Sequence, residues 1–285
     1  MATKRELLLR RHLQFNDGGV IAEIFIRPGQ PYRKLVNGRR VIPVGRLNAV
    51  KSGMKAQEWE SIRCELQMIE LCEVATPVHS IQSQPHGLYM KVAGRLKRLE
   101  YIPDLELQVD MGFALKVAAG EPFATAVKYW HPGKHGPLAT MVVEVKDDDD
   151  PRNDDVDYQD KLRLAKQVYQ GLGRFFVTVF RTRDLEAANI ARAVHEILLD
   201  HTVSVGAQDI EAVSKLFQKA GVPVETVPLS SICNALGIGP QGSSKASALH
   251  VRRVISIELD SGLAPHTAVR LVQDRRAIFE RRGAR

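Results

Sequence analysis

Residues 103–110 read PDLELQVD, and residues 140–146 read TMVVEVK. In both stretches apolar and polar side chains alternate with a period of two, which predicts strands that bury one face in a core. The buried rows are expected to be Leu105, Leu107 and Val109 in the first strand, and Met141, Val143 and Val145 in the second. The other face of each strand keeps the charged side chains, so the two strands decide both the sheet and the position of its charges.

Three of these charged residues, Asp104, Glu144 and Lys146, follow a PD-(D/E)xK pattern. If the two strands are neighbours, Asp104 and Glu144 converge and Lys146 lies within reach. Carboxylate oxygens suit one or two hard cations such as Mg²⁺ or Mn²⁺, which can activate water for phosphodiester hydrolysis beside a charge-stabilising lysine. Short acidic and basic pairs on strands are also common. The residues alone therefore leave open a metal site and a strand end with a surface salt bridge.

A helix is expected from Ala56 to near Glu73, because large apolar side chains repeat there at three- and four-residue intervals and the following Thr76-Pro77 disfavours continuation. The apolar stripe consists of Trp59, Ile62, Leu66 and Ile69. Glu65 borders this stripe. A carboxylate in that position tends to be either a salt-bridge partner or a metal ligand. Periodicity does not separate it from the other glutamates of the segment, which are Glu58, Glu60, Glu70 and Glu73.

The remaining pattern predicts an α/β fold with a mixed sheet flanked by helices. Further strands are expected at residues 78–84, 87–94 and 174–180, and a helix at 160–173 that ends at Gly171 or Gly173. Residues 111–139 are expected to form a hairpin-like insertion with loops. Beyond residue 182 the signals are helical only, with five candidate helices at 184–201, 207–221, 228–237, 246–262 and 267–282. We therefore predict two domains, 1–182 and a smaller, all-helical 183–285.

The net charge of +7 favours a polyanionic partner without proving one. The chain has no apolar run of about 18 residues and no signal-peptide pattern, so neither a membrane span nor secretion is expected. Its three cysteines, Cys64, Cys72 and Cys233, lack CxxC spacing. This argues against a disulfide framework or a zinc site and favours a cytoplasmic location.

Other charged segments allow more than one structural or functional interpretation. The run Asp147 to Asp150 is expected to be a solvated loop, the alternatives being a metal-collecting patch or a mimic of DNA. His131 and His135 are expected to be loop histidines rather than ligands. Residues 229–262 resemble either a helix-turn-helix, with Arg252, Arg253 and Lys245 as candidate DNA contacts, or an interaction module.

Three stretches together resemble the catalytic domain of the TnsA-like endonucleases of heteromeric transposases: residues 59–85, 101–109 and 141–146. The resemblance covers about residues 45–182. It implies a restriction-endonuclease-like fold in which Glu65, Asp104 and Glu144 are the metal ligands and Lys146 is the catalytic lysine. Gln84 and Pro85 then occupy a Gln-Pro position that supports the site without reacting.

The resemblance also implies a biological role. Such an enzyme cuts double-stranded DNA at the 5′ ends of a mobile element, while a separate DDE-type transposase cuts and joins the 3′ ends. It implies a winged-helix-like C-terminal domain that contacts DNA and an AAA+ ATPase regulator. Two other functions stay open: a stand-alone restriction or repair nuclease with the same site, and a DNA-binding assembly subunit without catalysis.

Overall fold

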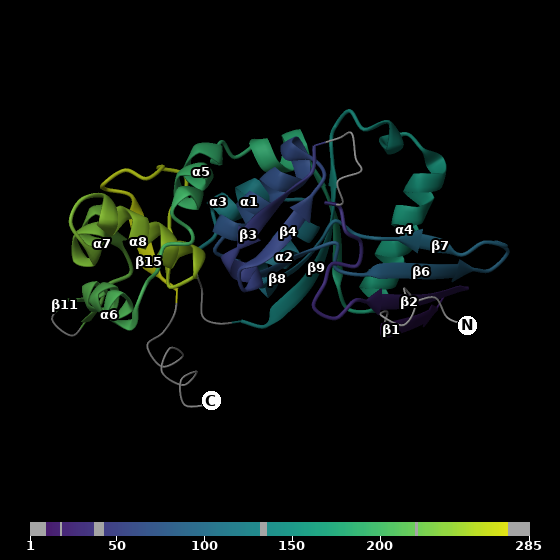
Figure 1. The fold of residues 1–285 in the computed structure, drawn as a ribbon, viewed down its shortest axis with the longest axis horizontal. Helices are drawn as coiled ribbons and strands as arrows, with labels where there is room; N and C mark the ends of the chain where they lie inside the picture. The colour runs from purple at the N-terminus through teal and green to yellow at the C-terminus, as the bar shows by residue number, and fades with distance from the viewer. Residues whose placement is uncertain (1–9, 18, 37–42, 132–135, 220–221, 273–285) are drawn as a thin grey trace.

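The computed structural model describes residues 10–17, 19–36, 43–131, 136–219 and 222–272, and its centre is a four-stranded mixed sheet (Figure 1). The strand order is β10–β9–β8–β5, with β8 antiparallel to both β5 and β9, and β10 parallel to β9. These strands span β5 Val78–Ser83, β8 Leu105–Asp110, β9 Leu138–Lys146 and β10 Phe175–Phe180. The strands expected from the alternation are therefore present, and the two charged ones are neighbours.

The two faces of this sheet follow the predicted alternation. Leu105, Leu107, Met141 and Val143 belong to a core that they share with helices α1, α2, α3 and α5. Val142, on the opposite face, packs into a second core with α4. The helices that flank the sheet are α1 Gln67–Val74, α2 Met111–Ala118, α3 Phe123–Lys128 and α4 Val156–Gly171.

A second four-stranded sheet lies beside α4 (Figure 1). Its order is β1–β2–β6–β7, all antiparallel, and its strands span β1 Arg10–Asp17, β2 Val20–Ile26, β6 Gly87–Val92 and β7 Leu99–Tyr101. Apolar residues of this sheet, such as Ile24 and Leu88, complete the core that Val142 shares with α4. The charged face of β8 and β9 is thereby enclosed by α4 and the second sheet.

Two expectations for residues 1–182 are wrong. Residues 55–59 form strand β4 Lys55–Trp59, paired in a hairpin with β3 Gly45–Ala49, so the helix does not begin at Ala56. It begins after Ser61, whose hydroxyl accepts the Cys64 N–H as an N-cap, and passes through a π-helical turn, Ile62–Leu66, into α1. Trp59 still packs against the core, but from a strand, which is why its spacing imitated a helical stripe.

The segment between the charged strands is also different from expectation. Instead of a hairpin-like insertion, about half of it forms helices α2 and α3. Phe113, Val117 and Phe123 from these helices are buried in the core under the sheet. The insertion is therefore a structural layer that covers the apolar face of β8 and β9.

The C-terminal part contains helices and a small sheet, so the all-helical expectation is wrong. Its helices span α5 Ala191–Leu199, α6 Ala207–Leu216, α7 Leu229–Leu236 and α8 Pro240–Val251. A three-stranded antiparallel sheet has the order β13–β15–β14, with β13 Val227–Pro228, β14 Ile255–Ile257 and β15 Ala268–Leu271, and a short pair joins β11 Gln218–Lys219 to β12 Val222–Pro223. The segments expected to be helical at 246–262 and 267–282 contain β14 and β15, and residues 273–282 lie outside the described part.

The C-terminal elements have a core of their own, centred on Ile232, Leu249 and Val269, and also pack on the rest of the chain through α5 and α1. The predicted division at residue 182 stays a prediction. In the described ranges, no helix is long and apolar enough to cross a membrane.

Candidate metal and catalytic site

A pocket of about 310 Å³ opens where β8 and β9 meet β7 and α4. It contains three of the residues predicted from the sequence, namely Glu65, Asp104 and Glu144. Its wall carries further acidic, basic and tyrosine side chains, which are Arg33, Glu60, Glu100, Tyr101, Arg152, Tyr158 and Lys161. The site is thus a polar pocket lined by both carboxylate and basic side chains.

Asp104 and Glu144 are brought together by the pairing of their strands. Leu105 pairs with Val143, and extending this antiparallel register by one residue places Asp104 opposite Glu144. The Asp104 carboxylate accepts the backbone N–H of Val145 at 2.8 Å. Burial, followed by the nearby charges of Glu144 and Glu65, holds the pKa of Asp104 well above its usual range. The pocket therefore favours the protonated form of Asp104 unless a positive charge offsets the neighbouring carboxylates.

Glu144 is bound on both carboxylate oxygens. Its Oε2 accepts the Tyr101 hydroxyl at 2.6 Å, and its Oε1 accepts the Tyr158 hydroxyl. The Lys146 ammonium lies 3.1 Å from the same Oε1. A cation that approached Glu144 through Oε1 would therefore compete with both Tyr158 and Lys146.

Lys146 is 1% exposed, although it carries a charge. It donates to the Tyr158 hydroxyl at 2.6 Å, and its Nζ lies 4.1 Å from the centroid of that ring. Asp150, at 3.7 Å, is a second carboxylate partner beside Glu144. A buried ammonium needs such partners because desolvation without them is costly.

Glu65 enters the pocket from the π-helical turn that precedes α1. Its Oε2 accepts the backbone N–H of Glu60 at 2.8 Å. Two other glutamates of the segment bind backbone elsewhere. Glu58 accepts the Leu35 N–H at 2.6 Å, and the fully buried Glu73 accepts the Val50 N–H at 2.5 Å. The structure therefore distinguishes Glu65 from Glu58 and Glu73, which periodicity did not.

Gln84 lies behind Asp104 in a strained conformation. It has φ +46°, a region that non-glycine residues rarely adopt, and it is fully buried. Its backbone N–H donates to the Asp104 carbonyl at 2.8 Å, and its side-chain oxygen accepts from Arg33 at 2.9 Å. Gln84 Nε2 is buried without a hydrogen-bond partner in the structure. Gln84 thus connects the backbone of Asp104 to the Arg33 side chain on the pocket wall.

Sequence reasoning missed the tyrosines and cations of the pocket. Tyr101 is two residues before Pro103 on an interrupted strand, and Tyr158 lies in the first turn of α4 after the acidic run. Arg152 and Lys161 flank Tyr158 in the sequence, and Arg33 comes from the segment after β2. Their positions depend on how α4 and the second sheet pack on the charged face, which no local pattern encodes.

The donors in this pocket suit a hard divalent cation, because they are carboxylate oxygens without cysteine or histidine. They do not form a ready-made cage. Within the residues that the structure describes, no three Asp, Glu, His or Cys side chains are grouped to hold a metal ion. The carboxylates are bonded instead to Val145, Tyr101, Tyr158 and Lys146, so cation binding requires exchange of these partners.

The acidic run after Lys146 is a loop whose aspartates have partners within the protein. Asp147 lies 3.2 Å from Arg181, Asp148 accepts the Thr182 N–H at 3.0 Å, and Asp150 pairs with Arg152 at 2.7 Å. The run is partly exposed, as expected for a solvated loop. The pairs that Asp147, Asp148 and Asp150 make within the protein argue against a metal-collecting patch. The exposed His131 faces Arg270 at 3.2 Å, and His135 lies outside the described residues.

The three candidate DNA contacts of the C-terminal part lie away from this pocket. Arg253 donates to the Thr76 carbonyl at 2.6 Å and contacts His79 at 2.8 Å, while Arg252 donates to the His201 carbonyl at 3.0 Å. Lys245 pairs with Asp209 at 2.7 Å. These bonds give each side chain a role inside the chain, and DNA binding by them stays a prediction.

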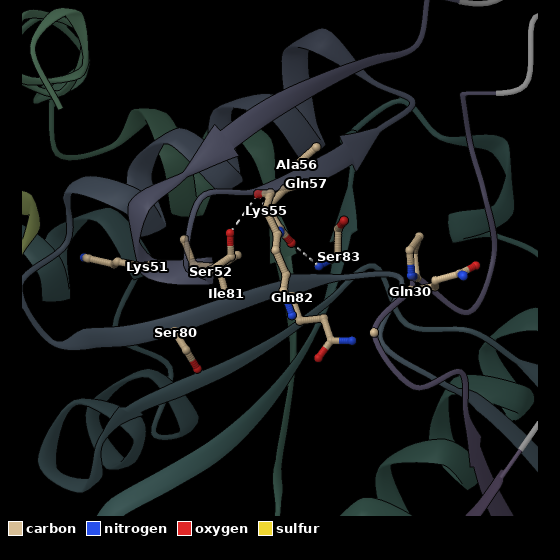
Figure 2. A pocket seen from close by; sticks show the side chains of 12 residues that line it. Gln30, Lys51, Ser52, Lys55, Ala56, Gln57, Ser80, Ile81, Gln82 and Ser83 are labelled. Atoms are coloured by element: carbon tan, nitrogen blue, oxygen red, sulfur yellow. Dashed lines mark hydrogen bonds between the residues drawn. The ribbon is translucent and has the colours of Figure 1, made fainter. Parts of the chain in front are cut away.

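A larger pocket, of about 550 Å³, lies between the β3–β4 hairpin and the edge of β5 (Figure 2). Serine, glutamine and lysine side chains line it beside apolar surface, and two of its walls are joined by the bond from the Ser83 N–H to Gln57 at 2.7 Å. Its lining contains no carboxylate, histidine or cysteine. This pocket therefore lacks the ligands that a catalytic cation needs.

No family model matches the chain, and no curated protein is significantly similar to it.

Proposed function

We propose that this chain is a divalent-cation-dependent DNA endonuclease with a PD-(D/E)xK site on a restriction-endonuclease-like core. The observation that carries the proposal is the meeting of Glu65, Asp104 and Glu144 in one pocket, with Lys146 on Glu144. The carboxylates come from a helical turn and two neighbouring strands. Residues so far apart in sequence do not converge through local structure alone.

In this proposal Asp104 and Glu144 are the principal ligands of Mg²⁺ or Mn²⁺, and Glu65 completes the set. Bound there, the cation would supply a nucleophilic water and stabilise charge on the phosphate. Burial, and then repulsion from Glu144 and Glu65, raises the pKa of Asp104, and a bound cation would relieve that repulsion, which supports this assignment. Gln84 holds the backbone of Asp104, so it supports the geometry of the site without contact to substrate.

Lys146 has the catalytic role of orienting water and stabilising the departing or attacking oxygen. To do so, its ammonium must move from Glu144 toward the pocket, which also releases Tyr158. Arg33, Arg152 and Lys161 on the pocket wall are suited to contact phosphate oxygens on either side of the cut.

The resemblance to TnsA-like endonucleases supports a particular setting for this chemistry. In that setting the chain cuts the 5′ ends of a mobile element, beside a DDE-type transposase and an AAA+ ATPase regulator. A stand-alone nuclease would instead nick naked duplex DNA with no partner present. A non-catalytic assembly subunit would support transposition with Glu144→Ala as well as with the unmodified residue.

The direct test is nicking of supercoiled DNA by the full chain, alone and with its transposition partners, in the presence of Mg²⁺ and Mn²⁺. Asp104→Asn keeps the size of the side chain and an oxygen that accepts from Val145, but it removes the charge. We expect a loss of at least about a hundredfold in the nicking rate, because a ligand to the cation is lost. Glu196→Gln, on the surface of α5, is the matched control and should nick normally.

Normal nicking by folded Asp104→Asn and Lys146→Ala would overturn the assignment. Absence of nicking with and without the partner proteins would overturn the enzymatic proposal and favour the assembly subunit.

A further inference from the structure

The loop between β6 and β7, residues 93–98, extends past the end of the second sheet (Figure 1). It reads AGRLKR, and its three basic side chains are exposed. Leu96, between them, is fully exposed. A single exposed leucine is ordinary on a protein surface, but here it stands at the tip of a projecting loop with a cation on each side. We call residues 93–98 the arm tip.

The arm tip is joined directly to the acidic pocket. Strand β7 leads from it to Glu100 and Tyr101, which line the pocket, and Tyr101 bonds Glu144. Four residues separate Leu96 from Tyr101, and the chain bends at residues 96 and 97 before β7 begins. The five steps from Leu96 to Tyr101 therefore span at most roughly 17 Å at about 3.3 Å per residue, or about five base pairs of duplex DNA.

Contacts with neighbouring elements hold the arm tip in place. Arg95 pairs with Asp160 of α4 at 2.5 Å, one residue before Lys161 on the pocket wall. The Arg98 guanidinium lies 4.4 Å from the centroid of the Tyr89 ring on β6. Lys97 makes no such contact in the structure's described part and is exposed. Basic side chains thus lie both on the pocket wall and on the arm tip. They are Arg152 and Lys161 on the wall, and Arg95, Lys97 and Arg98 on the tip.

We propose that the arm tip binds duplex DNA whose scissile phosphate lies in the pocket. Lys97 and Arg98 contact phosphates within about five base pairs of the cut, and Leu96 enters the adjacent minor groove. Basic ribbons with an apolar tip suit this partner, because the cations replace counterions on the phosphates and the apolar side chain packs against base edges. The inference rests on the proposed function for its choice of DNA, but binding by the arm tip does not require cleavage.

The experiment measures binding of the full chain to a random-sequence 30-base-pair duplex by fluorescence anisotropy, without divalent cations, from 50 to 200 mM salt. The arm variant carries Lys97→Ala and Arg98→Ala. Its matched control carries Lys116→Ala and Arg192→Ala, two exposed cations on α2 and α5. The arm variant should bind about tenfold more weakly at 50 mM salt, with a salt slope lower by about 2, and the control should bind like the unmodified chain.

Leu96→Ser changes no charge, so it should weaken binding severalfold without changing the salt slope. Equal affinities and slopes for the arm variant and the unmodified chain would overturn the proposal, and so would a control that weakens binding as much as the arm variant. Nicking by Asp104→Asn is assayed on the same duplex. If Asp104→Asn loses nicking but the arm variant binds normally, the arm proposal is wrong and the nuclease proposal stands. If Asp104→Asn nicks normally but the arm variant binds more weakly, the nuclease proposal is wrong and DNA binding by the arm tip stands.

Discussion

Glu144 is the residue on which the chemistry of the pocket depends most, because it accepts hydrogen bonds from two tyrosines and pairs with a lysine. Tyr101 holds one oxygen, whereas Tyr158 and Lys146 share the other. Strand alternation predicted Glu144 on the charged face of its strand, opposite Asp104 only if the two strands are neighbours, and the structure pairs these strands. The alternation gave no sign of Tyr158, whose hydroxyl reaches Glu144 from a different element.

Substitution of Tyr158 tests this competition. Tyr158→Phe keeps the ring over Lys146 but removes the hydroxyl that donates to Glu144. Because a cation then displaces one bond fewer, we expect Mn²⁺ to bind severalfold more tightly in isothermal titration calorimetry. Tyr89→Phe is the control, since Tyr89 bonds Glu100 and Tyr32 rather than Glu144. Unchanged or weaker Mn²⁺ binding by Tyr158→Phe would contradict the competition.

A second residue, His250 of α8, makes the stability depend on pH. Burial lowers the pKa of His250 to about 3, and its Nδ1 accepts the Ile257 N–H at 3.0 Å. The folded chain thus keeps this histidine neutral, whereas the unfolded chain protonates it below about pH 6.5. The unfolded state binds more protons in this window, so His250 lowers the free energy of unfolding as the pH falls from 6.5 toward 3.

His250→Asn should reduce that pH dependence, because the Asn oxygen can accept the same N–H and does not titrate. Between pH 6.5 and 5, the loss of unfolding free energy should be smaller by about 2 kcal/mol than in the unmodified chain. Urea unfolding at the two pH values measures it. An identical loss in both proteins would show that His250 is protonated in the folded state.

At the scale of elements, Glu73 fixes the β3–β4 hairpin to the C-terminal end of α1. It accepts the backbone N–H groups of Val50 and Lys51, and the Lys51 ammonium donates to the Cys72 and Ala75 carbonyls. Glu73→Ala leaves these buried donors without an acceptor, so we expect a loss of about 3 kcal/mol in unfolding free energy by urea denaturation. Glu70→Ala, on the same helix but half-buried, should lose less than about 1 kcal/mol.

Elements were predictable from the sequence where one face of a strand is apolar throughout. The alternation of β8 and β9 is a property of single strands, so their faces followed from Leu105, Val143 and their neighbours. The helix predicted from Ala56 failed because Trp59 packs into the core from a strand. The segments at 255–257 and 268–271 are too short for their strand pattern to outweigh helical spacing around them.

At the scale of the whole molecule, the pocket is made by five separate parts of the chain. They are the segment after β2, the turn before α1, the β7–β8 segment, β9, and the stretch from Arg152 into α4. The sequence predicted the carboxylates of three of these parts, since the PD-(D/E)xK pattern and the family resemblance name them. The enclosing tyrosines and basic side chains required the packing of α4 and the second sheet, which depends on contacts distant in sequence.

The C-terminal part is attached to the rest of the chain through buried polar contacts as well as apolar ones. Thr76 and Ser256 share a hydrogen bond at 2.9 Å, and Arg253 bridges to Thr76 and His79 beside it. Arg253 has φ +58°, so the chain turns at this contact and enters β14 instead of continuing α8. This contact explains why a helix expected to run to residue 262 ends at Val251.

The central claim, that Asp104, Glu144 and Glu65 jointly hold a divalent cation, is tested most directly by anomalous scattering from crystals of the full chain grown with Mn²⁺. The account predicts a peak in the pocket with oxygens of Asp104 and Glu144 at about 2.2 Å and Lys146 displaced from Glu144. Crystals that show no peak there, with Lys146 and Tyr158 still bonded to Glu144, would contradict it.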